Sequence, residues 1–384
     1  GRGPTSPNRS TLERSSAFPE TLHVLAAMVA FRPDNDSRSS GDGSFDTSSA
    51  GRLIIDPPPH DRAYVAQHLT FLENYFRRVS HGKLIVKGDL LGAVYRLPYV
   101  MQHYSPPRNT AGNVELGLLM RDAWHLVDSA TPGVPFGNYQ AFLLIHAGAG
   151  RDVDLTSIFG FDPTPFDIPS IYLNLSSLKK MFGESYGGVS VDSGRFTIEN
   201  TIIMPETESR DVATATGTAR LQLGINGLLA ASIGSHLGLP DLFDTKTGAS
   251  GIGRFGLMDG QSIFSWSGLF PPEPSAWERY FLGWITPVTL TGGNAVYSLP
   301  AAGTANQEDS VYKVLISARE YFLVENRNRD ANSDGSTVTI FRNGQSDSLT
   351  WRRDTAGFNA FNVDSLYGVV TDVDEFDWSL PGGV

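Results

Sequence analysis

Apolar runs and apolar residues at helical spacing divide the first part of the chain into recognisable elements. Thr21–Phe31 is a short apolar run closed by a Pro-Asp-Asn cluster, and it predicts a first buried strand. Ala63–Arg78 carries apolar residues at helical spacing and predicts an amphipathic helix. We expect Lys83–Tyr95 to form a pair of strands around Gly88, and Asn113–Val127 to form a second helix.

The middle of the chain alternates between strong and weak patterns. Tyr139–His146 predicts a central strand. Residues 151–220 are irregular and rich in Gly, Pro, Ser and Asp, with strand-like pieces at Ser170–Leu175 and Phe196–Met204. Gly224–Leu237 is apolar nearly all round, which predicts a buried helix.

The pattern changes after a Pro-rich stretch. Ala276–Leu282 is expected to be helical, and short strands are expected at Ala295–Leu299, Ser310–Ile316 and Tyr321–Glu325. This order of elements predicts an α/β (α+β) protein with a mixed sheet and a buried helix, followed by a smaller β-rich region. We divide the chain into a flexible N-terminus (1–18), a main domain (19–287) and a C-terminal region (288–384) that is expected to be incomplete.

Composition narrows the function classes. The 384 residues are 40% hydrophobic and 18% charged, so the chain can bury a core, and the net charge of −11 disfavours nucleic acid as a partner. No cysteine is present, which excludes disulfides and thiolate metal ligands. The longest apolar runs are too short to cross a bilayer. Residues 1–16 are polar, as in a mature terminus from which a signal peptide has been removed.

Residues 227–284 contain the most specific motifs. They read GLLAASIGSHLGLPDLFD, then GRFGLMDG, then PSAWERYFLGW. This stretch resembles the immune inhibitor A family of zinc metallopeptidases, which carry HExGHxLGLPDLYD, a Met-turn of the form LMG, and a Ser-Ala-Trp-Glu…Leu-Gly-Trp element. Leu237–Asp244 matches the end of the first motif and Gly256-Leu257-Met258 matches the Met-turn, although Asp259 stands where a glycine is usual.

The resemblance extends over nearly the whole chain from about residue 20. Leu22–Phe31, FLENYFRRVSHGKLIVKG (71–88), LLIHAGAG (143–150), IIMPE (202–206) and YFLVENR (321–327) are each similar to a family segment, in the family's order. The resemblance implies a zincin-like metallopeptidase domain with a buried active-site helix.

The residues that would perform the chemistry are missing. Aligned on LGLPD, Ala231 and Ser232 occupy the positions of the family's first His and its Glu, and Ser235 that of its second His. Zinc-peptidase chemistry needs two imidazoles four residues apart and a Glu as general base. Only Asp241 remains, at the position of the third, acidic ligand. We therefore expect that zinc binding has been lost and that a vestigial cleft is lined by His236, Asp241 and Met258.

His236 leaves one alternative open. It lies one position past the lost ligand, which turns it by roughly 100° away from the metal face of a helix. We favour a structural His236; the alternative is an active metallohydrolase whose rearranged site uses His236, Asp241 and a distant His. Replacement of all three catalytic-helix residues is more typical of natural decay than of laboratory inactivation.

A second metal-binding pattern follows the YFLVENR segment. Asp330-Ala-Asn332-Ser-Asp334-Gly335 matches the first half of an EF-hand calcium loop, with Asp330, Asn332 and Asp334 as the candidate ligands. Phe341 stands where the bidentate Glu is expected, so the alternative is an Asx-rich turn. The acidic residues Asp372, Asp374, Glu375 and Asp377 are interpreted as a solvated face.

The remaining candidates are assigned structural roles. Seven histidines are scattered singly and each is interpreted as a structural histidine: His23, His60, His68, His81, His103, His125 and His146. Seven aromatic residues are expected to pack beneath the former active site rather than to line a groove: Phe264, Trp266, Phe270, Trp277, Tyr280, Phe281 and Trp284.

The resemblance also bears on the end of the chain and on function. FDWSLPGGV (376–384) is similar to a family segment that continues further, so the natural chain is expected to extend past Val384. An intact scaffold without its chemistry is expected to serve as a binding or structural subunit, periplasmic or extracellular. Its partner would be a protein, such as one belonging to a membrane-associated complex, and the chain itself would not span the membrane.

Overall fold

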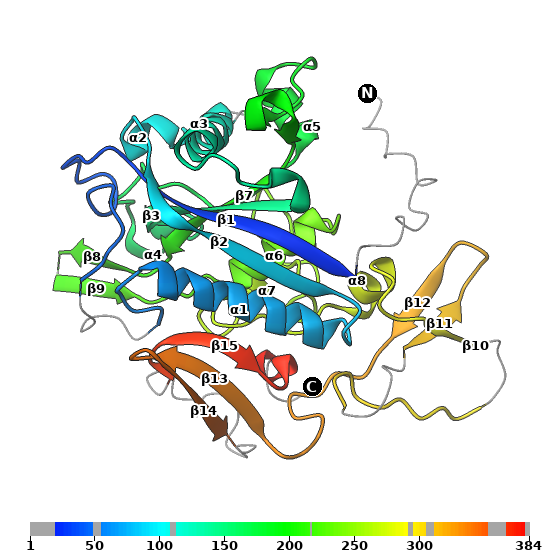
Figure 1. Ribbon diagram of the computed structural model, residues 1–384. Helices are drawn as coiled ribbons and strands as arrows, with labels where there is room; N and C mark the ends of the chain where they lie inside the picture. Colours follow the sequence, from blue (N-terminus) through cyan, green and yellow to red (C-terminus); the bar gives the residue numbers. More distant parts are fainter. Residues whose placement is uncertain are drawn as a thin grey trace, which may run out of the picture.

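The computed structural model describes residues 20–48, 55–107, 113–215, 217–290, 295–304, 311–351 and 366–380. The expected N-terminal segment 1–18 and the last four residues, Pro381–Val384, lie outside the described residues. Within the described ranges the chain forms a mixed α/β body around a mixed sheet, with a β-rich C-terminal region (Figure 1).

The central sheet has the strand order β2-β1-β3-β7-β4. Its strands are β1 (Thr21–Ala30), β2 (Ile85–Arg96), β3 (Ala141–Ala149), β4 (Ile171–Leu173) and β7 (Thr201–Thr207). The first four in spatial order run parallel, and β4 pairs antiparallel with β7 at the edge. Every residue of β3 is buried, as expected for a parallel strand with both faces covered.

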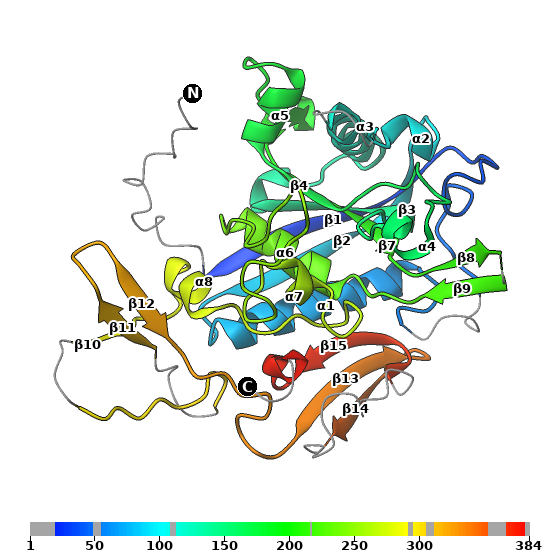
Figure 2. The ribbon, with the colours of Figure 1, turned by 180° about the vertical axis from the view of Figure 1, so that it is seen from behind.

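Helices cover both faces of this sheet. The longer ones are α1 (Arg62–Val79), α3 (Val114–Ala130), α5 (Leu175–Phe182) and α6 (Asn226–His236); the shorter ones are α2 (Met101–Tyr104), α4 (Leu155–Phe159), α7 (Gly260–Ile263) and α8 (Ala276–Phe281). Figure 1 shows α3 on one face and α1 on the opposite face. Seen from behind in Figure 2, α6 and α7 lie on the α1 side. Helix α6 contacts α1, β4 and β7, so it is enclosed by the sheet and its neighbours.

Short elements complete the main body. They are the hairpins β5 (Val189–Val191) with β6 (Phe196–Ile198) and β8 (Arg210–Thr214) with β9 (Gly217–Leu221), and the 3-10 turns Phe136–Asn138 and Asp192–Gly194. A further 3-10 turn, Phe376–Ser379, lies in the C-terminal region.

The β-rich C-terminal region consists of two separate three-stranded sheets. One contains β10 (Val288–Leu290), β11 (Tyr312–Leu315) and β12 (Tyr321–Val324); the other contains β13 (Ser336–Arg342), β14 (Gln345–Trp351) and β15 (Val369–Val373). The β14-β13-β15 sheet packs against α1 (Figure 1), and Phe376 meets Tyr75 of α1 edge-on with ring centroids 4.7 Å apart. This sheet therefore shares the main hydrophobic core. The division at residue 287 stays a prediction.

Most predicted elements are confirmed, and three strand predictions are wrong. Residues 85–96 form one strand, because Gly88 pairs in register with Val24 and its missing side chain leaves room for Leu69 of α1, which would lie 2.9 Å from a Cβ there. Residues 196–204 belong to two strands. Residues 295–299 form no strand; Val296 is fully exposed there, and a strand needs a neighbour to pair with.

Candidate functional site

Helix α6 carries Ala231, Ser232 and Ser235, the residues that the resemblance described above aligns with catalytic positions. Its first residue, Asn226, is buried and donates from its side chain to the carbonyl oxygens of Leu269 (3.0 Å) and Val370 (2.8 Å). Ala231 is 6% exposed, while Ser232 and Ser235 are partly exposed further along the helix. A methyl group and two hydroxyls provide neither a zinc ligand set nor a general base.

The two remaining polar candidates are His236 and Asp241. His236 faces the edge strand, with Nδ1 3.2 Å from the Tyr172 hydroxyl, and burial lowers the pKa of His236 to about 4. Asp241 is exposed beyond the end of the helix. Among the described residues, neither belongs to a group of three His, Cys, Asp or Glu side chains close enough to share one metal ion.

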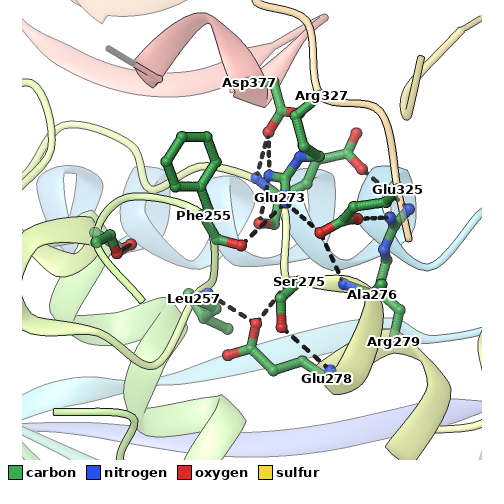
Figure 3. A network of polar contacts seen from close by, with 12 residues as sticks. Phe255, Leu257, Glu273, Ser275, Ala276, Glu278, Arg279, Glu325, Arg327 and Asp377 are labelled. Atoms are coloured by element: carbon green, nitrogen blue, oxygen red, sulfur yellow. Dashed lines mark hydrogen bonds and ion pairs between the residues drawn. The ribbon is translucent and has the colours of Figure 1, made fainter. Parts of the chain in front are cut away.

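The Met-turn is held by a buried carboxylate (Figure 3). Glu278 of α8 accepts the backbone N–H groups of Leu257 (3.1 Å) and Met258 (2.9 Å), and it completes a capping box with Ser275. Burial raises the pKa of Glu278, against the lowering effect of these hydrogen bonds. Met258 lies directly under α6, since a Cβ added to Gly234 would meet its Sδ at 2.7 Å. The Ser-Ala-Trp-Glu element and the Met-turn are therefore one packing unit.

Asp259, which departs from the family pattern, has its own structural role. It N-caps α7 through the N–H of Gln261 (2.9 Å), and its other carboxylate oxygen accepts the N–H groups of Gly251 (2.8 Å) and Ile252 (3.1 Å). The carboxylate thus fixes the loop before the Met-turn.

A buried arginine connects the same turn to the C-terminal region (Figure 3). Arg327, from the YFLVENR segment, donates to the carbonyl oxygen of Phe255 (3.1 Å) and to the carboxylate of Asp377 (2.6 Å from Nε). Burial alone would lower the pKa of Arg327, but Asp377 and the neighbouring glutamates raise it well above its usual value. Arg279 of α8 joins the network through Glu325, at 2.7 Å. Asp377, interpreted from sequence as part of a solvated face, is in fact buried.

A second buried cluster was missed by the sequence interpretation, which treated its histidines as isolated. His60 bonds Glu206 of β7 (3.0 Å) through Nδ1 and the carbonyl oxygen of Asp56 (2.9 Å) through Nε2. Burial lowers the pKa of His60, but Glu206 and Asp56 outweigh this effect and raise it overall. His68 donates to Asn226 Oδ1 (2.7 Å).

The cluster positions the start of helix α6. Asp56 Oδ2 accepts the N–H of Ile225 (3.1 Å), immediately before α6, and lies 3.9 Å from Nε2 of His68. Burial lowers the pKa of His68 and raises that of Asp56. The four-residue spacing of Tyr64 and His68 in the predicted helix would have indicated that these two residues share a helix face, whereas His60 lies before the helix and is brought to them by the fold.

A third polar group lies where β3 and β7 end. Glu208 and Asp167 are fully buried, and Arg210 pairs with Asp167 at 2.9 Å. Burial, and then the nearby Asp152 carboxyl, raise the pKa of Glu208 well above its usual value. Gly150 is required beside it, since a Cβ would lie 1.6 Å from Glu208 Oε1. This group ties the strand ends together.

The calcium-like loop gathers an additional carboxylate. One carboxylate oxygen from each of Asp330, Asp334 and Glu375 lies within 4.8 Å of the others. The predicted ligand Asn332 acts as a hydrogen-bond donor instead, because its amide nitrogen donates to Glu375 Oε1 (2.7 Å). Burial and the charge of Asp330 raise the pKa of Glu375 to about 7, against the hydrogen bonds from Asn332.

The remaining members of the acidic C-terminal segment are also engaged. Asp372 pairs with Arg78 of α1 at 2.6 Å, and Asp374 accepts the N–H of Thr337 at 2.7 Å. The interpretation of this segment as a solvated face is therefore wrong for Glu375 and Asp377, which are buried, whereas Asp374 is exposed as expected.

The aromatic residues around the Met-turn lie in or against the core. Trp266, Phe270 and Trp284 are buried. Those that are partly buried and packed against the core are Phe264, Trp277, Tyr280 and Phe281.

Comparisons with known proteins assign no family to the chain. No protein-family model matches the sequence, and no curated protein matches it. In the described ranges, no helix has both the length and the apolar character needed to cross a membrane.

Proposed function

We propose that this protein is a catalytically inactive homologue of the immune inhibitor A-type zinc metallopeptidases, with a zincin-like main domain. It acts as a binding or structural subunit of a complex in the periplasm or outside the cell. The proposal rests on a contrast between the packing of helix α6 and its chemistry. Helix α6 retains its contacts with Met258 and its buried anchor Asn226, while Ala231, Ser232 and Ser235 provide no metal ligand or base.

The well-ordered packing around helix α6 and the Met-turn suggests that the scaffold is kept for a purpose other than catalysis. Glu278 and Arg327 hold the Met-turn with buried, charge-assisted hydrogen bonds. Such a network stabilises a scaffold whether or not a metal is bound. A fold that keeps this scaffold without its chemistry fits a protein that is used for its surface.

An exposed apolar sheet face supports a protein partner. Val314 of β11 pairs with Phe322 of β12, so both side chains lie on the same face of the β10-β11-β12 sheet. Phe322 is 63% exposed, and Val288 and Val324 on this face are also exposed. On the opposite face, Leu323 packs against the small apolar cluster of Ala276, Ile285 and Val311. Contiguous exposed apolar side chains are typical of interaction surfaces.

Restoring the three lost residues tests the loss of chemistry. The native chain and the triple variant Ala231→His, Ser232→Glu, Ser235→His would be titrated with zinc and incubated with an unstructured protein substrate. We expect one zinc per chain in the triple variant only, with Ala231→His alone as a one-ligand control. Stoichiometric zinc and peptide-bond cleavage by the native protein would overturn the proposal in favour of an active metallohydrolase with a rearranged site.

The subunit role has its own test. After gentle extraction, the native chain is expected to elute in a complex larger than its own 41.7 kDa. Phe322→Ser should release it from that complex while leaving its fold intact, because the side chain is exposed. A freely migrating native chain would refute the subunit role.

A further inference from the structure

The loop between β12 and β13 has the backbone arrangement of a cation-binding turn. Asp330 is buried, and its Oδ1 accepts the N–H groups of Asp334 (3.0 Å) and Gly335 (3.2 Å). Gly335 has φ = +87°, a conformation that favours glycine and allows the chain to reverse sharply. The first, fifth and sixth residues of a calcium loop are therefore in place, with the turn glycine at position six.

A remote acidic residue supplies what the loop sequence lacks. Strand β13 pairs antiparallel with β15, with Val338 opposite Val373 and the N–H of Asp374 donating to Thr337. Continuing this register brings Glu375 beside the start of β13, next to the loop. Its carboxylate thereby joins those of Asp330 and Asp334, in place of the missing twelfth-position Glu.

The described part of the chain supplies no positive partner for the buried carboxylates. Glu375 is only 6% exposed, and its Oε2 is buried and accepts no hydrogen bond from the residues that the structure describes. Neither Asp330 nor Glu375 forms an ion pair with any residue in the described part of the chain. Burying carboxylates in this way is unfavourable unless a cation or a proton compensates the charge.

We infer that Asp330, Asp334 and Glu375 bind one calcium ion. Three carboxylates form an all-oxygen ligand set, which hard cations prefer. Asp334 is exposed, so the ion can enter from solvent, and water would complete the coordination. Bound calcium ties the β12–β13 loop to the end of β15, two residues before Asp377 and its contact with Arg327. The site does not depend on the proposed function, because it lies outside helix α6.

Calorimetric titration of the full chain with CaCl2, after removal of divalent ions by a chelator, tests the site. We expect one calcium per chain and a melting temperature that rises with calcium concentration. Glu375→Gln can still accept the hydrogen bonds from Asn332, so it should fold, and it should weaken calcium binding at least ~10-fold. Asp347→Asn, which changes an exposed acid on β14, should bind calcium like the native chain.

A second ligand variant, Asp330→Asn, and a titration with MgCl2 test the site further. Asp330→Asn can still accept the loop N–H groups and should also weaken binding, with circular dichroism confirming that both variants fold in chelator. Absence of calcium binding by the native chain, unchanged affinity in Glu375→Gln, or equal affinity for MgCl2 would each overturn the calcium site.

Discussion

Replacing Arg327 by Met is expected to be among the most damaging single changes outside the hydrophobic core. The guanidinium reaches Asp377 through two nitrogens and donates to the carbonyl oxygens of Phe255 and Glu273. Met fills much of the space of the arginine stem but donates no hydrogen bond. The variant therefore leaves a buried carboxylate without its cation and two carbonyl groups without their donor.

The burial of Asp377 determines how much stability the Arg327→Met variant is expected to lose. Asp377 is 3% exposed, so water does not solvate it well, and among the described residues the donor that remains to its carboxylate is the N–H of Glu273 at 3.1 Å. Removing one partner of a buried ion pair destabilises a protein by about 3–5 kcal/mol. A solvent-exposed pair contributes about 0–1 kcal/mol. Arg342→Met, which breaks the half-exposed pair with Asp347, is therefore the matched control.

Urea unfolding followed by tryptophan fluorescence measures both variants. Trp378 is adjacent to Asp377, and its ring lies beneath the guanidinium of Arg329, so the signal reports on this region. We expect a large fall in the free energy of unfolding for Arg327→Met and a small one for Arg342→Met. Adding Asp377→Asn to Arg327→Met should restore part of the loss, because no unpaired buried charge remains.

A loss for Arg327→Met no larger than that of the control would refute the reasoning. So would a double variant less stable than Arg327→Met alone, since the unpaired Asp377 charge would then not be the cause. Either result would mean that the Met-turn and the C-terminal segment are held together by apolar packing.

Two further predictions concern helix α6. Gly227→Ala should destabilise the protein by about 1–3 kcal/mol or more, because the added Cβ would lie 1.9 Å from the Ile263 carbonyl oxygen; Gly260→Ala, with no atom within 4 Å, should change unfolding by less than about 0.5 kcal/mol. His236 has a folded-state pKa of about 4, below its usual 6.5, because the fold favours the neutral imidazole. Its contribution to the free energy of unfolding is therefore fully present above pH 6.5 and is lost as the pH falls towards 4, by up to roughly 3 kcal/mol. Stability measured between pH 7 and pH 4 should therefore fall less steeply in His236→Gln, and parallel profiles would contradict the burial of a neutral imidazole.

The local elements were largely predictable because their signals are local. The apolar run in β1, the helical spacing in α1 and the largely apolar composition of α6 are each signals contained within one segment. The strand predictions failed where a partner decides the outcome. Gly88 stays within a strand because β1 and Leu69 accommodate it, whereas no strand in the described ranges pairs with Val296.

For the candidate sites, too, the sequence determines the chemistry of single residues and short turns, while the fold decides which distant residues meet. By itself, the sequence determined that Ala231, Ser232 and Ser235 provide no zinc chemistry, because a side chain's donor atoms are a property of its residue type. It also indicated the turn from Asp330 to Gly335, whose hydrogen bonds span only a few residues.

Only the tertiary structure decided which distant residues meet. Strand pairing brings Glu375 to the calcium-like loop, and chain packing buries Asp377 against Arg327 and His60 against Glu206. A pattern read along the chain cannot show these contacts, because they join residues 43 to 146 positions apart. Burial then changes the chemistry, since a carboxylate or imidazole that would be solvated in an open chain needs a charged or hydrogen-bonded partner inside the fold.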